Sequence, residues 1–195
     1  MAAWLERRFD ARLTWLPYDL HPEYPPEGIR REELARRHGA GFGSHIRQLF
    51  VAAGLADSGP PDVVPRSQDA LRLTELARDL GLHEPVHDRL MDALWREGLD
   101  LGERDVLRRL GTEAGLPAAR LDEVLAGEDY LDRVTASTRE AVWIGVTGIP
   151  GFLLDGRLLV LGAQPREVFE QAFSQLEASG PGSGRGPGGR ADQEP

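Results

Sequence analysis

The sequence predicts an α/β fold in which a large helical insertion interrupts a single unit of strands and helices. Short strand patterns occur near both ends of the 195-residue chain, over residues 11–20 and residues 152–160. Between them, apolar residues recur at helical spacing, and glycines occupy the positions where helices end. Strands at the two ends with helices between them favour one interrupted α/β unit over a helical bundle.

The first residues are expected to form the beginning of this α/β unit. Residues 3–9 have the apolar spacing of a helix. Residues 11–20 alternate in part, are rich in strand-forming side chains and stop at His21 and Pro22, which predicts a strand. Prolines and a glycine predict a loop over residues 24–28.

A series of helices is predicted from residue 29 onward. Ser67 is a suitable N-cap, and Pro117 suits the first turn of a helix. Glycines follow several of the periodic segments at the place where a helix C-cap belongs. The predicted helices cover residues 29–38, 42–57, 67–80, 86–97, 103–114, 117–127 and 129–143.

The C-terminal part returns to strands and one helix. Two apolar triplets, residues 152–154 and 158–160, flank Asp155 and Gly156, a pair that favours a two-residue hairpin turn. Pro165 begins a last amphipathic helix, and the composition from residue 179 predicts a disordered tail. We therefore expect three parts: an α/β part (residues 1–22 and 141–178), a helical insertion domain (23–140) and the tail (179–195).

Composition excludes several classes of function. A net charge of -9 argues against a protein that binds nucleic acid or an anionic membrane surface. No apolar stretch is long enough to span a membrane, and the charged first twenty residues do not resemble a secretory signal, so a cytoplasmic location is expected. The absence of cysteine excludes disulfides, thiolate nucleophiles and cysteine-based zinc sites within these residues.

One C-terminal segment carries a resemblance to a known family. Residues 146–156 (VTGIPGFLLDG), followed by residues 161–165 (LGAQP), resemble the second half of a DsbA-like thioredoxin-fold domain. Residues 15–22, 26–28 and 97–102 agree with it, so that the resemblance covers about residues 3–178. The chain is similar to the cytoplasmic branch with FrnE-type oxidoreductases. This branch is related to 2-hydroxychromene-2-carboxylate isomerases and kappa-class glutathione transferases. The implied fold is thioredoxin-like with an all-helical insertion.

The resemblance implies a substrate-binding loop at Gly148, Ile149 and Pro150. In such proteins the proline of this loop is cis, and the residue before it lies beside the reactive thiol and against the bound partner chain. The loop would therefore bind an extended peptide through strand-like hydrogen bonds. The alternative is that Pro150 simply begins an edge strand, where proline is tolerated.

The start of the family's domain has no counterpart in this sequence. The family begins with a strand that leads into Cys-x-x-Cys, or a serine variant, whereas Met1 corresponds to a position inside the following helix. No catalytic residue is therefore predicted. The missing strand would lie between the strand at residues 11–20 and that at residues 152–154, leaving unpaired backbone groups. The two strands can pair directly, another chain can supply a strand, or the true start codon lies upstream, which we favour.

A second motif, His83-Glu84-Pro85-Val86-His87, matches the H-E-x-x-H pattern of zinc metalloproteases. Proline is accepted in the first turn of a helix but not in its interior. We therefore expect a helix to begin here with His83 or Glu84 outside it, and we predict no metal site and no cofactor. His21, His38 and His45 have no partner at ligand spacing, and the large aromatic side chains are expected mostly in the core.

These observations lead to two hypotheses about function. In the first, the chain is a DsbA-family thiol–disulfide oxidoreductase that cannot perform dithiol exchange as written. In the second, it is a module that binds a peptide or an apolar small molecule without redox chemistry. A glutathione-dependent isomerase or transferase is less favoured, because it needs an N-terminal serine that is also missing. The sequence does not indicate an oligomeric state.

Overall fold

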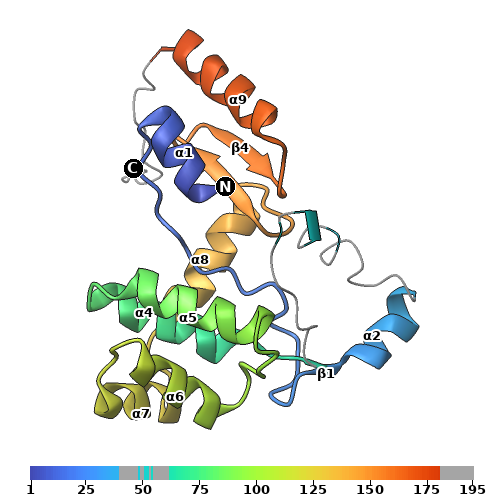
Figure 1. The fold of residues 1–195 in the computed structure, drawn as a ribbon, viewed down its shortest axis with the longest axis vertical. Helices are drawn as coiled ribbons and strands as arrows, with labels where there is room; N and C mark the ends of the chain where they lie inside the picture. Colours follow the sequence, from blue (N-terminus) through green and yellow to red (C-terminus); the bar gives the residue numbers. More distant parts are fainter. Residues whose placement is uncertain (40–47, 49–50, 53, 55–61, 181–195) are drawn as a thin grey trace, which may run out of the picture. The chain divides into compact units, whose positions relative to one another are not determined.

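The structure is a computed structural model that describes residues 1–39, 48, 51–52, 54 and 62–180. The chain divides into two compact units (Figure 1). Unit 1 contains residues 1–14 and the chain from residue 142 onward, and unit 2 contains residues 15–141. Along the described ranges, no helix is long and apolar enough to cross a membrane.

Unit 1 is a β-hairpin with two helices. Its elements are α1 (Ala2–Phe9), β3 (Gly151–Leu154), β4 (Leu158–Leu161) and α9 (Arg166–Ala178). The strands are antiparallel, with Phe152 opposite Val160. Leu154 and Val160 point to one face of the hairpin and form a core with residues of α1 and α9, among which Phe169 is fully buried. The predicted helices and hairpin at both ends of the chain are confirmed, with boundaries shifted by one or two residues.

Unit 2 is mainly helical. Its elements are β1 (Ile29–Arg30), α2 (Arg31–His38), β2 (Val63–Val64), α4 (Gln68–Asp79), α5 (His83–Trp95), α6 (Arg104–Glu113), α7 (Ala118–Ala126) and α8 (Leu131–Trp143), whose last two residues belong to unit 1. The short strands β1 and β2 form a separate antiparallel pair. The helix predicted over residues 42–57 lies almost wholly outside the described residues, and so does the predicted tail beyond residue 180.

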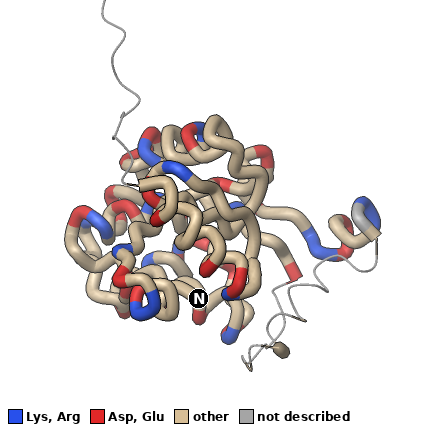
Figure 2. Tube along the Cα trace, turned by 90° about the horizontal axis from the view of Figure 1, so that it is seen from above, with Lys and Arg blue, Asp and Glu red and all other residues tan. Residues whose placement is uncertain are grey.

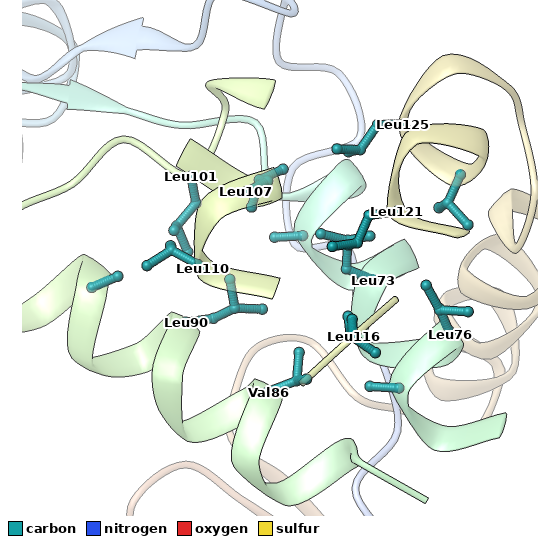
Figure 3. Close-up of a cluster of buried hydrophobic side chains, with 14 residues drawn as sticks. Leu73, Leu76, Val86, Leu90, Leu101, Leu107, Leu110, Leu116, Leu121 and Leu125 are labelled. Carbon is teal, nitrogen blue, oxygen red and sulfur yellow. The ribbon is translucent and has the colours of Figure 1, made fainter. Parts of the chain in front are cut away.

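The core of unit 2 forms because apolar side chains recur on one face of each helix. Leu73, Leu76 and Ala77 of α4 lie at helical spacing and are almost completely buried. They pack against leucines and valines of α5, α6 and α7 (Figure 3). Acidic and basic residues are interspersed along the described chain (Figure 2), and exposed ion pairs join helices of this unit, such as that of Arg108 with Asp122.

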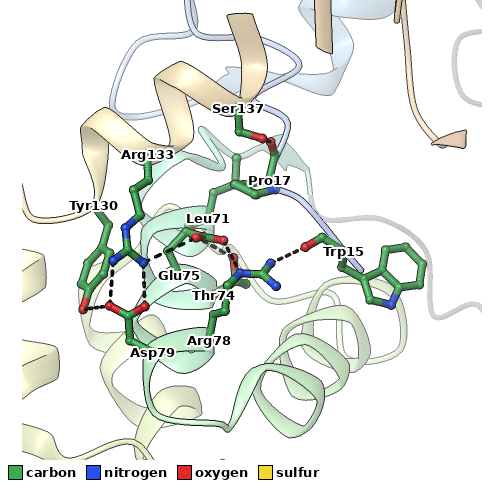
Figure 4. Close-up of polar contacts among 10 residues, drawn as sticks. All are labelled: Trp15, Pro17, Leu71, Thr74, Glu75, Arg78, Asp79, Tyr130, Arg133 and Ser137. Carbon is green, nitrogen blue, oxygen red and sulfur yellow. Dashed lines mark hydrogen bonds and ion pairs between the residues drawn. The ribbon is translucent and has the colours of Figure 1, made fainter. Parts of the chain in front are cut away.

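The strand predicted over residues 11–20 is wrong. This segment forms no strand and pairs with no other described strand, because helix side chains bond its backbone groups instead. The Arg78 guanidinium and the Ser137 hydroxyl donate to the carbonyl oxygens of Trp15 and Pro17 (Figure 4). The Asp19 N–H donates to the Thr138 hydroxyl at 2.9 Å. The first of the three arrangements considered above, direct pairing of this segment with residues 152–154, is therefore not present.

The predicted two-residue hairpin turn is also wrong in length. The strand pairing ends at Leu154 and Leu158, so three residues connect β3 to β4. Asp155 and Gly156 have positive φ angles of 51° and 63°, as the sequence pair allows. The Arg157 N–H donates to the Leu154 carbonyl at 3.0 Å and closes the turn. Arg157 is therefore part of the connection and not the first residue of β4.

Candidate functional site

The three predicted site residues lie next to one another where the chain enters the hairpin. Gly148, Ile149 and Pro150 directly precede β3, and the peptide bond between Ile149 and Pro150 is cis. The Pro150 carbonyl accepts a hydrogen bond of 2.8 Å from the N–H of Gly162, which follows β4. The Ile149 side chain is 56% exposed. The loop therefore presents an apolar side chain to solvent at the open end of the hairpin.

Gly151, the first residue of β3, allows the loop to pack closely on itself. A Cβ atom at this position would lie 3.2 Å from Cγ1 of Val146, which is buried. Such a distance is tight, so a larger residue at position 151 would push the loop away from the hairpin. The glycine after the proline is a signal for this packing that the sequence analysis did not use.

The hydrogen bond between Gly162 and Pro150 fixes which backbone groups face away from β4. In an antiparallel pair, residues alternate between positions that bond the neighbouring strand and positions that do not. Because Pro150 bonds Gly162, Phe152 and Leu154 are also at positions that face β4. The N–H and C=O groups of Gly151 and Leu153 therefore point to the outer edge of β3. Among the described residues, no other strand and no side chain hydrogen-bonds this edge.

The face of the hairpin opposite the core is apolar and partly open to solvent. Leu153 is 49% exposed and Leu161 is 36% exposed, while Leu159, opposite Leu153, is half-buried. Sequence analysis assigned these leucines only to strands. It missed their exposure, because alternation in a short apolar run does not reveal which face is covered.

The H-E-x-x-H motif lies in unit 2, at the beginning of α5. The helix begins at His83, so the expectation that His83 or Glu84 lies outside it is wrong. Pro85 is in the first turn, where the N–H that proline lacks has no helical partner in any case, so the helix can begin two residues before it. The parallel rings of His83 and His87 have centroids 5.7 Å apart, and His87 also stacks on Trp15 at 5.3 Å.

Burial of the two imidazoles makes their charged forms less favourable. Desolvation is the main cause that lowers the pKa of His83, and the nearby Arg78 guanidinium adds to it. Desolvation also lowers the pKa of His87, while Asp88 opposes the shift. Within the described ranges, no group of three or more histidine and acidic side chains has the arrangement of a metal site. Desolvation thus favours the uncharged form of both imidazoles, which pack against each other and, in the case of His87, against Trp15.

Two tryptophans differ from the expectation that large aromatic residues lie mostly in the core. Trp15 and Trp143 are exposed, whereas Phe152 packs at the edge of the core of unit 1.

Of the remaining histidines, His21 contacts Glu23 with its Nδ1 atom 3.0 Å from a carboxylate oxygen. Phe42, Phe50 and His45 lie outside the described residues, as does the side chain of His38.

Comparisons with known proteins agree on the class of fold. A crystal structure of a probable DsbA oxidoreductase from Streptomyces coelicolor has a TM-score of 0.76 and 27% sequence identity to this chain. The match covers 95% of this chain and 82% of that one. The uncharacterized protein YwbO of Bacillus subtilis is 23% identical over 168 residues, which cover 85% of this chain and 82% of YwbO.

The family model of the DsbA-like thioredoxin domain matches residues 2–174. This range includes the Gly148–Pro150 loop, the hairpin and most of α9, together with the helices that the structure describes in unit 2. The fold is thus thioredoxin-like, and in the order of the sequence the helices of unit 2 come between α1 and the hairpin. The chain belongs to the family of DsbA-like thioredoxin domains.

Proposed function

We propose that these residues bind an extended polypeptide at the Gly148–Pro150 loop and do not exchange disulfides themselves. Disulfide exchange requires a thiolate, and the 195 residues contain no cysteine. The observation that carries the proposal is the exposed Ile149 side chain beside Pro150 at the beginning of β3. In the family that the chain resembles, the residue at this place lies against the bound partner.

Several further assignments form part of the same proposal. Residues 1–22 and 141–178 would be the thioredoxin-like binding part, and residues 23–140 would be the helical insertion. The FrnE-type branch is assigned on sequence motifs alone. A chain without disulfides does not need an oxidising compartment, which supports a cytoplasmic location.

A binding experiment with an unfolded polypeptide tests this function. The probe is a fluorescein-labelled polypeptide that has been reduced and carboxymethylated, and the readout is fluorescence anisotropy. We expect the protein to bind it, and we expect Ile149→Asp to weaken binding about tenfold, because the carboxylate would lose hydration against an apolar partner. The matched control is Leu16→Asp in unit 2, where the side chain is 69% exposed.

Two outcomes would contradict the proposal. If the polypeptide does not bind, or if both variants bind as well as the unmodified protein, the loop is not the binding site. Reduction of insulin disulfides by these 195 residues would contradict the absence of exchange chemistry. Circular dichroism of each variant establishes that the fold is unchanged.

A further inference from the structure

We infer that the imidazoles of His83 and His87 form a two-ligand site on α5 for a divalent transition-metal ion, and that Cu(II) is the ion this site binds most tightly. The inference goes beyond the proposed function, because it concerns a helix of unit 2 and does not depend on the Gly148–Pro150 loop. The zinc site of a metalloprotease, which we do not expect here, needs a third protein ligand. Two imidazoles with water in the remaining positions make a simpler and weaker site.

The first argument is the spacing of the two histidines. His83 and His87 are four residues apart in one helix, so their side chains lie on the same face, one turn apart. The two zinc-binding histidines of H-E-x-x-H proteases have the same spacing. The rings are parallel to within 11°, with centroids 5.7 Å apart. A metal ion holds an imidazole nitrogen at about 2.0–2.1 Å, so rotation about side-chain bonds, without movement of the helix, lets each ring offer one nitrogen to the same ion.

The second argument is that the nitrogens of these rings are available. Among the described residues, no donor or acceptor hydrogen-bonds either imidazole, whereas Nδ1 of His21 lies 3.0 Å from Glu23. Both rings are partly buried and partly open to solvent. Trp15 stacks on His87, with ring planes 26° apart and centroids 5.3 Å apart. Stacking covers a face of the imidazole, and the nitrogen lone pairs lie in the ring plane, so the stacked ring can still bind a metal ion.

The third argument is the charge around the pair. Asp88 and Glu75 are negative groups that act on the imidazoles, and Arg78 is the positive group that opposes them. The Arg78 guanidinium is already engaged, because its Nε atom lies 3.1 Å from Glu75 and it donates to the Trp15 carbonyl (Figure 4). Glu84 in the first turn of α5 offsets the positive end of the helix dipole. The surroundings of the pair therefore tolerate an added cation.

The donor set determines which ions the site takes. Imidazole nitrogen suits Cu(II), Ni(II) and Zn(II), whereas Mg(II) and Ca(II) prefer oxygen ligands. Nitrogen sites bind Cu(II) more tightly than Ni(II) or Zn(II). With only two protein ligands, water fills the other positions, and the bound ion exchanges with ions in solution.

Titration of the unmodified protein with Cu(II), after a chelator has removed other metals, tests the site. Isothermal titration calorimetry measures the affinity, and electron paramagnetic resonance counts the nitrogen ligands. We expect the tightest Cu(II) site to have two imidazole nitrogens, and we expect excess Mg(II) or Ca(II) not to displace the ion. Bound Cu(II) should quench the fluorescence of Trp15, which stacks on His87, so Trp15→Phe should remove much of the quenching.

Variants of α5 test whether the two imidazoles act as a pair. His83→Gln and His87→Gln should each weaken Cu(II) binding by about tenfold or more, because each removes one ligand. The matched control combines His87→Gln with Asp88→His, which keeps the number of histidines but places the imidazoles five residues apart, on different faces of the helix. This control should bind no better than His87→Gln alone. His21→Gln, outside α5, should bind like the unmodified protein.

Three results would overturn the inference. Affinities of His83→Gln and His87→Gln within about twofold of the unmodified protein would place the ion elsewhere. Coupling to fewer than two imidazole nitrogens, or displacement by Ca(II), would show that carboxylates hold the ion. Recovery of the original affinity when Asp88→His is added to His87→Gln would show that spacing is irrelevant.

One further measurement does not depend on any variant. Circular dichroism checks that each variant is folded, and for an unfolded variant the nuclear magnetic resonance spectrum of the unmodified protein decides instead. Substoichiometric Cu(II) should broaden the ring signals of His83 and His87 before those of His21, and equal broadening of all three would contradict the inference. None of these results bears on polypeptide binding, so the proposed function is tested separately.

Discussion

Arg72 of α4 secures the end of another helix. It is 4% exposed, and it donates to backbone carbonyls at the end of α7, those of Val124 and Gly127, and to the carbonyl of Asp129. Its Nη1 atom donates to a carboxylate oxygen of Asp69 at 2.7 Å. The last carbonyl groups of a helix have no partner within the helix, so this guanidinium satisfies groups that would otherwise be buried without one.

Replacing Arg72 by methionine should therefore destabilise the protein strongly. We expect Arg72→Met to lower the free energy of unfolding by about 3 kcal/mol, the cost of removing one partner from a buried ion pair. The measurement is urea unfolding followed by circular dichroism. Arg109→Met is the control, because Arg109 is about half exposed and its ion pair with Glu113 contributes at most about 1 kcal/mol. Equal losses in the two variants would contradict this role of Arg72.

The role of Arg72 illustrates what sequence reasoning at the level of single residues cannot provide. Its carbonyl partners lie between 52 and 57 residues away along the chain. Arg108 and Arg109 are about half exposed in their ion pairs, whereas Arg72 is buried, and the local sequence does not distinguish these arginines. By contrast, Gly148, Ile149 and Pro150 could be put forward as a candidate site because they form a contiguous motif.

At the scale of elements, helices and the hairpin were predictable from local pattern, whereas the pairing of segments was not. Apolar spacing predicted α4, α6 and α7 to within about two residues. The segment over residues 11–20 has strand-forming side chains, but a strand also requires a neighbouring strand to pair with. Here α4 and α8 supply the hydrogen-bond partners of its backbone, and local sequence does not contain that information.

The beginning of α5 should make stability depend on pH. His83 and His87 stack on each other and have pKa values below the ordinary value of 6.5 because they are partly desolvated. The unfolded chain therefore binds protons at a higher pH than the folded chain, so stability decreases as the pH falls below about 7. The charged groups that act on the pair are Arg78, Glu75 and Asp88.

Replacing both histidines by glutamine should remove this contribution. We expect the unmodified protein to lose more unfolding free energy than the double variant between about pH 7.5 and about pH 5.5. Urea unfolding at several pH values measures the difference, and the carboxylates that titrate at lower pH are common to both proteins. His21→Gln is the control, because His21 lies outside α5 next to Glu23. The same pH dependence in the double variant and the unmodified protein would contradict the prediction.

At the scale of the whole molecule, the two units have separate cores of different size. Among the residues that the structure describes, the buried cluster of unit 2 contains fourteen residues drawn from four helices and the loops that join them. In the described part of unit 1, the buried cluster contains five residues, and the sheet consists of a single hairpin. Stabilisation from apolar burial increases with the area removed from water, and a two-stranded hairpin is only marginally stable by itself. Unit 1 should therefore open more readily than unit 2.

Hydrogen exchange measures this difference directly. We expect the amides of β3 and β4 to exchange at least about tenfold faster than those in the middle of α4, because local openings of the smaller core need less free energy. The Gly151 and Leu153 amides, which point to the outer edge, should exchange faster still than the Phe152 amide, which faces β4. Equal protection of β3 and α4 would contradict the assignment of unit 1 as the less stable part.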